Sequence, residues 1–184
     1  RSLRAVQAAV NDEKKFNVAS ERKFSGIDAY QKVINSGVDL VILTSPPGFR
    51  PGHLRAAVEA GKHVFTEKPM AIRVEQAQAM VDAAARAGVI LQVGHSHSYD
   101  LPIARMREIV ASGALGSVRV IHTWNFTDWM ARPRRPAEFD VSQGGGVTYR
   151  QGAHQIDILR LIGGGLVKSV RASMFDWHPT RRSI

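Results

Sequence analysis

The spacing of three short apolar runs constrains the fold of this chain more than any other feature. These runs read as buried strands, at residues 38–43, 62–65 and 89–93. Each gap between them carries apolar residues at helical spacing and is closed by a glycine, Gly61 or Gly88. Strand, helix, strand, helix, strand in this order predicts a parallel sheet with right-handed crossovers. We therefore expect an α/β fold with all three strand ends, at Thr44, Thr66 and Gly94, on one edge.

The second half of the chain has a different pattern. We expect four elements there, namely a helix at 103–110, a half-buried strand at 118–124, a helix at 154–162 and an alternating strand at 167–174. The glycine runs at 144–146 and 163–165 do not continue as G-x-G-x-x-G and are expected to form turns. The change of pattern divides the chain into a first domain, 1–93, and a second α/β domain, 94–184.

Composition narrows the class of protein. With 44% hydrophobic residues among 184, the chain can bury a core, and it has no apolar run long enough to span a bilayer. We therefore expect a cytoplasmic protein without membrane contact. The absence of cysteine excludes disulfides and thiolate metal sites. The formal charge of +9, with arginines gathered within 132–135 and 181–182, leaves nucleic-acid binding open. No zinc finger or RNA-binding motif accompanies it, so solvated charge, with a few arginines serving anionic small molecules, is favoured.

Lys68 is the strongest candidate for catalysis. It follows the second strand in the run Thr66-Glu67-Lys68-Pro69, beside a carboxylate and before a rigid proline. Partial desolvation at the open edge of a sheet would make a lysine a better proton donor or acceptor. The alternative is an ordinary surface lysine.

A group of histidines offers a second chemistry. His95 and His97 follow the third strand, and with His122, His154 and Asp157 they could form the metal site of a hydrolase. These residues belong to separate elements, so a partly exposed loop histidine is the simpler interpretation of the first two. His154 and Asp157 are three residues apart and share one helix face. That face either points into a cleft or is the polar outer face of an amphipathic helix.

Four stretches form a recognisable set. They are 38–47 followed by His53, then 60–69, 93–94, and the run from Gly144 to Gly152, His154 and Asp157. This set resembles the Gfo/Idh/MocA oxidoreductases and covers most of the chain from about residue 28 onward. The resemblance implies an incomplete Rossmann-like parallel sheet followed by an incomplete α/β substrate domain. It also implies NAD or NADP as cofactor and hydride transfer with a hydroxylated small molecule.

The resemblance assigns roles to single residues. Lys68 is the expected acid/base at the substrate hydroxyl, and His154 is a second proton-transfer or hydrogen-bonding group. The residues that would line the cofactor are Thr44, Ser45, Pro46, Pro47, His53, Glu67, Lys68 and Pro69. No metal is expected among the site residues.

The substrate side departs from the family pattern at Arg150, where many members carry an aspartate. A guanidinium there suits a substrate with carboxylates, because arginine binds them bidentately. The stretches 128–133 and 148–157 resemble the branch that includes 4,5-dihydroxyphthalate dehydrogenase, which implies a cyclic dihydrodiol that bears carboxylates. The expected substrate residues are Arg150, Asp157, Arg132 and His95. The alternatives are a sugar or inositol substrate, or a non-catalytic nucleotide-sensing module.

The family's opening strand and its G-x-G-x-x-G turn do not occur in this sequence, and strands of the second domain's open sheet are also unaccounted for. We therefore expect a fragment that binds cofactor weakly by itself. Its full-length parent is expected to form a homo-oligomer.

Overall fold

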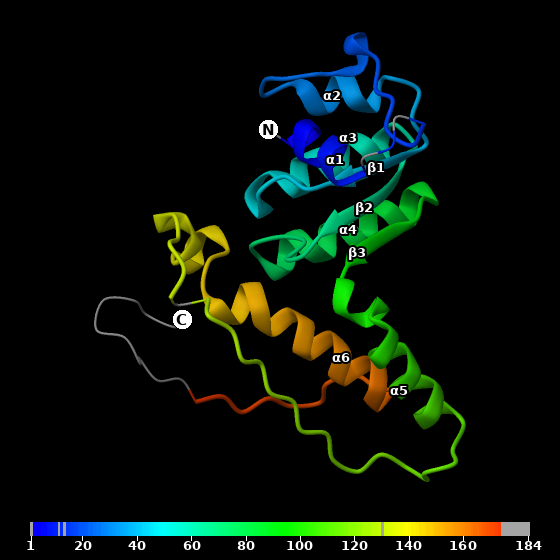
Figure 1. The fold of residues 1–184 in the computed structure, drawn as a ribbon, viewed down its shortest axis with the longest axis vertical. Coiled ribbons are helices and arrows are strands. Elements are labelled where there is room, and N and C mark those ends of the chain that lie inside the picture. Colours follow the sequence, from blue (N-terminus) through cyan, green and yellow to red (C-terminus); the bar gives the residue numbers. More distant parts are fainter. Residues whose placement is uncertain (1, 11, 13, 130, 174–184) are drawn as a thin grey trace.

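The computed structural model describes residues 2–10, 12, 14–129 and 131–173 (Figure 1). At its centre is a parallel sheet with the order β1 (Leu40–Leu43), β2 (His63–Glu67), β3 (Leu91–Gly94). The register pairs Leu43 with Thr66 and Glu67 with Gly94, so the strands end together at one edge. The expected α/β fold with a parallel sheet is confirmed.

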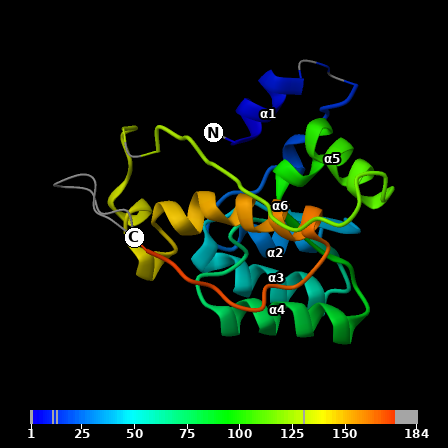
Figure 2. The same ribbon diagram turned by 90° about the horizontal axis from the view of Figure 1, so that it is seen from below.

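Helices cover one face of this sheet. The crossovers are α3 (Arg50–Glu59) and α4 (Val74–Ala87), with α2 (Ala29–Ile34) beside α3 (Figures 1 and 2). Their apolar sides meet alternate strand residues in one core, built from Ile34, Val41, Leu43, Leu54, Ala57, Val58, Val64, Ala71, Met80 and Ala84. Leu40 and Ile42 point to the opposite face and are 51% and 62% exposed. Burial on one face therefore fixes which side of each strand is apolar.

The second half packs against the carboxyl edge of the sheet. It contains the turn η3 (Ser96–Tyr99), then α5 (Leu101–Ala111), a π-helical turn η6 (Thr148–Gly152) and α6 (Ala153–Gly163). Helix α6 contacts both α5 and η3. The remaining elements are α1 (Ser2–Val10) and the short turns η1 (Ser20–Arg22), η2 (Pro47–Phe49), η4 (Pro136–Glu138) and η5 (Val141–Gln143). No helix in the described part of the chain is long and apolar enough to cross a bilayer.

Two sequence predictions fail in this half. The strand expected at 118–124 and the part of the second strand at 167–173 are irregular, while Met174 lies outside the described residues. A strand requires a hydrogen-bonded neighbour, and neither segment has one among the described residues. Val120 and Trp124 are accordingly 70% and 77% exposed. The predicted turns at the glycine runs are confirmed, because Gly144, Gly146 and Gly164 all adopt a positive φ.

Candidate functional site

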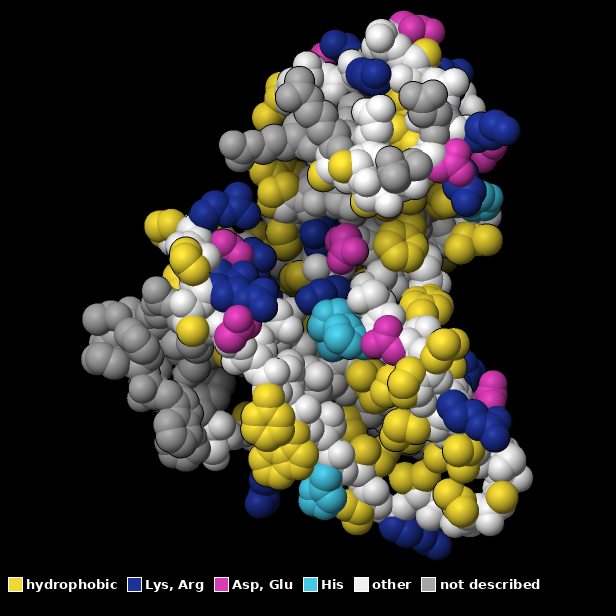
Figure 3. Space-filling model, in the orientation of Figure 1, with side chains coloured by type: hydrophobic (Ala, Val, Ile, Leu, Met, Phe, Trp, Pro, Cys, Tyr) yellow, Lys and Arg dark blue, Asp and Glu magenta, His cyan; other side chains and the backbone are white. Residues whose placement is uncertain are grey.

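The carboxyl edge of the sheet carries the main candidate residues. Lys68 follows β2 directly and His95 follows β3 directly. Since Glu67 pairs with Gly94 in the parallel register, Lys68 and His95 each lie one residue beyond that pair. Ligands of α/β proteins bind outside this end of the strands. Figure 3 shows basic, acidic and histidine side chains gathered where this edge meets the second half.

Arg50, which the sequence analysis did not single out, ties the loops at this edge together. It begins α3 and is only 6% exposed. Its guanidinium donates hydrogen bonds to the carbonyl oxygens of Ser45 and Glu67, both at 2.7 Å, and to that of Pro69. Ser45 follows β1, Glu67 ends β2 and Pro69 lies in the segment after β2, so one buried side chain fixes the backbone on both sides of Lys68.

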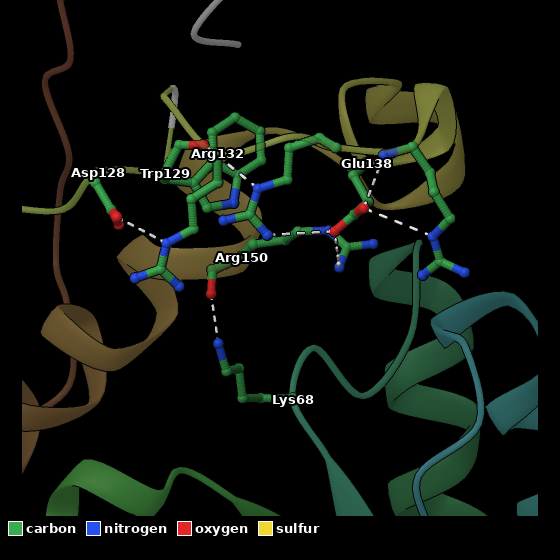
Figure 4. Close-up of polar contacts among 8 residues, drawn as sticks. Lys68, Asp128, Trp129, Arg132, Glu138 and Arg150 are labelled. Carbon is green, nitrogen blue, oxygen red and sulfur yellow. Dashed lines mark hydrogen bonds and ion pairs between the residues drawn. The ribbon is translucent and has the colours of Figure 1, made fainter. Parts of the chain in front are cut away.

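Lys68 reaches from the sheet edge to the second half. Its Nζ donates a hydrogen bond to the backbone carbonyl of Arg150 in the π-helical turn (Figure 4). Burial lowers the pKa of the Lys68 amine, Glu67 opposes this, and the charges of Arg150 and Arg50 lower it further. A lysine in this setting releases and accepts protons closer to neutral pH than an exposed one does.

The π-helical turn is docked on the segment that follows Lys68. Tyr149 donates a hydrogen bond from its hydroxyl to the carbonyl of Ile72, at 2.8 Å. Before the turn, the backbone at Gly145 is so close to Glu138 and Asp140 that a Cβ would lie 2.7 Å from their backbone atoms. The glycine is therefore required for close packing. Isolated π-helical turns occur frequently at functional sites.

His154 lies buried in the first turn of α6, 6% exposed. Burial, and then the positive charge of Lys68, lower its pKa to about 4, with smaller contributions from His97 and His95 in the same direction. His154 is thus neutral at pH 7. Its ring meets that of His97 edge-on, with the centroids 4.1 Å apart. The helix face predicted to carry His154 and Asp157 therefore points into the protein at His154.

Three arginines surround one carboxylate on the other side of Lys68. We call this the arginine cluster: Arg134, Arg135 and Arg150 lie 3.4, 3.6 and 3.7 Å from the Glu138 carboxylate (Figure 4). The backbone N–H of Arg135, and then the charges of Arg150 and Arg134, hold the pKa of Glu138 below its usual value. Arg134 also lies 5.0 Å above the ring of buried Trp129. One carboxylate facing three guanidinium groups leaves an excess of positive charge that favours an anionic ligand.

The other predicted site residues are less central. Arg132 is an exposed side chain paired with Asp128 at 2.8 Å (Figure 4). Asp157 accepts a hydrogen bond from the Ser98 hydroxyl. His53 contacts the Ser45 hydroxyl at 3.2 Å and stacks on Tyr30. Among the predicted cofactor residues, Thr44 and Pro46 are exposed, Ser45, Glu67, Lys68 and Pro69 are partly buried, and Pro47 is buried.

Several buried polar atoms at this site have no partner among the described residues. They are His95 Nδ1, His154 Nδ1 and Arg150 Nε, and Trp129 Nε1 nearby. Buried polar groups are nearly always hydrogen-bonded, so atoms like these suit a polar ligand such as a nicotinamide nucleotide with its substrate. Within the described residues, no three or more histidine or acidic side chains are arranged to bind a metal ion. The alternative metal site at His95, His97, His122, His154 and Asp157 is thus not assembled.

Sequence reasoning missed Arg50, Arg134 and Glu138. Arg50 precedes His53 by three residues, so both lie on one face of α3, and a helix-face argument could have included it. Arg134 and Glu138 are four apart, a spacing typical of an ion pair on a helix, but they lie in a loop and a short turn. Their role depends on Arg150, which is close only in the folded chain.

Two family models match the chain. The first, described as an oxidoreductase family with an NAD-binding Rossmann fold, matches residues 2–95. The second, described as the GFO/IDH/MocA C-terminal domain, matches residues 103–182. The two matches include the sheet with Lys68 in the first half and the arginine cluster with α6 in the second.

Individual relatives are enzymes by name. The chain is 44% identical to a 1-carboxy-3-chloro-3,4-dihydroxycyclo hexa-1,5-diene dehydrogenase of Comamonas testosteroni, over 81% of this chain and 38% of that protein. It is 33% identical to a scyllo-inositol 2-dehydrogenase (NADP(+)) of Bacillus subtilis, over 80% of this chain and 40% of that protein. A crystal structure of a protein assigned as a dehydrogenase from Bordetella bronchiseptica RB50 is 36% identical with a TM-score of 0.82, over 92% of this chain and 43% of that chain. The chain thus spans about two fifths of the length of the curated relatives it matches.

Proposed function

The chain belongs to the Gfo/Idh/MocA family of oxidoreductases, and on this premise we propose that the intact protein is an NAD(P)-dependent dehydrogenase of carboxylated cyclic diols. By the intact protein we mean the whole polypeptide that carries these residues. The observation that carries the proposal is the position of Lys68, a partly buried amine of lowered pKa between the sheet edge and the arginine cluster. An amine at this position can exchange a proton with a substrate hydroxyl, and a guanidinium beside it can bind a substrate carboxylate.

The roles of the residues follow from these contacts. When bound at the sheet edge, a nicotinamide nucleotide would supply the hydride acceptor for the carbon that carries the substrate hydroxyl. Lys68 in its neutral form takes the proton of that hydroxyl, and His154, neutral at pH 7, assists. We assign cofactor binding to residues 1–93 and substrate binding to residues 94–184. Assembly into a homo-oligomer and a cytoplasmic location stay predictions.

Two observations support the substrate class. The Comamonas testosteroni relative is named for a cyclic diene with one carboxyl and two hydroxyl groups. Among the described residues, Arg150 has a buried Nε without a hydrogen-bond partner, and its cluster has more guanidinium groups than carboxylates. An uncharged polyol, such as the inositol named for the Bacillus subtilis relative, would form no ion pair with these guanidinium groups.

The intact protein should reduce NAD⁺ or NADP⁺ in the presence of a cis-dihydrodiol carboxylate of a benzene ring. We expect kcat/KM for this diol to exceed that for scyllo-inositol or glucose by about 30-fold or more, since a charged pair left unmade in a site costs roughly 2 kcal/mol or more. The absorbance of the reduced nicotinamide measures the rates with the diol and with the polyols. A higher kcat/KM for the uncharged polyols would contradict the proposed substrate class. Absence of turnover with both the diol and the polyols would contradict the proposed dehydrogenase activity.

Replacing Arg150 by glutamine tests the carboxylate contact. The KM for the carboxylated diol should rise about 10-fold to 100-fold, while kcat/KM for an uncharged polyol changes less than about threefold. Arg132→Gln is the matched control, because its guanidinium is exposed and already paired with Asp128. Its steady-state KM should stay within about twofold of the wild type. A larger effect at Arg132 than at Arg150 would move the carboxylate site to Arg132.

A further inference from the structure

His97 lies between the buried site and the surface. Its ring meets that of His154 edge-on at 4.1 Å between centroids, and its Nδ1 lies 3.4 Å from the carboxylate of Asp100. The side chain of His97 is 52% exposed and that of Asp100 is 58% exposed, whereas His154 is buried. The contacts therefore run from the interior to solvent in two steps.

The turn that carries His97 is fixed to the helix that carries His154. Ser98 in η3 donates a hydrogen bond to the carboxylate of Asp157 in α6. This hydrogen bond joins η3 to α6 close to the contact between the rings of His97 and His154. The hydrogen bond between Ser98 and Asp157 therefore helps to hold the ring of His97 against that of His154.

We propose that His97 carries the substrate proton from His154 to solvent, with Asp100 as the outer acceptor. This inference rests on the proposed dehydrogenase function and adds a path for its second product. Oxidation of an alcohol releases a hydride, which goes to the nicotinamide, and one proton, which the Lys68 amine accepts. Lys68 passes the proton to one ring nitrogen of His154 through a bridging water, since Lys68 Nζ itself bonds the carbonyl of Arg150. His154 releases a proton to His97, directly or through water, and then to Asp100 or solvent. Every residue returns to its starting state, and each turnover delivers one proton to solvent.

The surroundings of His154 keep a proton from resting on its ring. Lys68 and His95 face His154 from the sheet edge, Asp157 faces it from its own helix, and Asp100 faces His97. Burial and the charge of Lys68 hold the pKa of His154 at about 4, so this ring does not retain a proton at neutral pH. Protonation of this ring is therefore unfavourable by itself, and transfer onward to His97 or water completes the step.

The test is His97→Gln in the intact protein, assayed with NAD⁺ or NADP⁺ and the diol that the wild type oxidises. We expect kcat to fall by about tenfold or more with KM within twofold, and free imidazole in the buffer to restore much of the loss. His63→Gln is the matched control, because His63 lies at the opposite end of β2 and glutamine retains an acceptor for the Ile90 N–H. Its kcat should be unchanged, with and without imidazole.

The outcomes separate the inferences. A raised KM with unchanged kcat would make His97 a binding residue and overturn the path. A fall in kcat that imidazole does not restore would reduce His97 to a structural support and overturn it as well. Full activity in His97→Gln would overturn the path and leave the dehydrogenase standing, whereas an inactive wild type would overturn both.

Discussion

Substituting methionine for Lys68 should lower kcat for diol oxidation by about 10²-fold to 10⁴-fold, the range typical of a lost general acid or base. Methionine keeps most of the length of the side chain but cannot exchange a proton. The loss should appear in kcat and kcat/KM together, because the contact matters most in the transition state. Steady-state kinetics with a saturating nicotinamide nucleotide measure it.

The pH profile gives an independent reading of the same residue. Neutral amine, the form that accepts the proton, is present above the pKa of Lys68. Since burial lowers that pKa from its ordinary value, the oxidation rate should rise with pH at a lower pH than an exposed lysine would allow. Lys68→Met should lose this rise. Lys62→Met, before β2, is the control, and a wild-type rate in Lys68→Met would remove the lysine from the mechanism.

Arg50→Met should reduce the free energy of unfolding by about 3–5 kcal/mol. The substitution leaves the carbonyls of Ser45, Glu67 and Pro69 without their donors, which are Nε for Ser45 and a single shared Nη1 for the other two. Each of these two charged donor groups contributes roughly 1.5–3 kcal/mol. Equilibrium unfolding in urea measures the change. Activity should fall as well, since the segments on both sides of Lys68 lose their common anchor.

Arg55→Met is the matched control for this prediction, because Arg55 is an exposed arginine of the same helix. Its free energy of unfolding should stay within about 0.5 kcal/mol of the wild type. The free energy of unfolding of Arg50→Lys should lie between those of Arg50→Met and Arg55→Met, because an ammonium cannot reproduce the several donors of a planar guanidinium. Equal stability of Arg50→Met and Arg55→Met would show that the three bonds contribute nothing measurable.

The sequence was sufficient for the parts of the fold that depend on local pattern. Strand periods, glycine stops and the spacing of the crossovers predicted the three parallel strands and their common edge, and hence the placement of Lys68 and His95. The helix at 154–162 was also predictable, and α6 runs Ala153–Gly163. These features are set by residues close together in the chain.

The remainder depends on contacts between distant residues. Alternation at 118–124 is compatible with a half-buried strand, but pairing decides, and no strand partner lies beside that segment among the described residues. Glu138 becomes important because Arg150 approaches it, and Arg50 because two loops converge on it. The π-helical turn Thr148–Gly152 has no marker in composition or period. The roles of Lys68, His154 and Arg150 stay predictions until the variants are measured.

The partner of Lys68 in the second half is a main-chain oxygen, that of residue 150, and every amino acid supplies one. Holding the lysine therefore places no demand on which side chain stands at that position. The neighbouring side chain is free to change sign or size during divergence, from a carboxylate to a guanidinium, without the lysine losing its hold. Such a separation would let one lineage exchange substrates at a single codon while the lysine keeps its place, although the pKa of the lysine would still respond to the charge at that position.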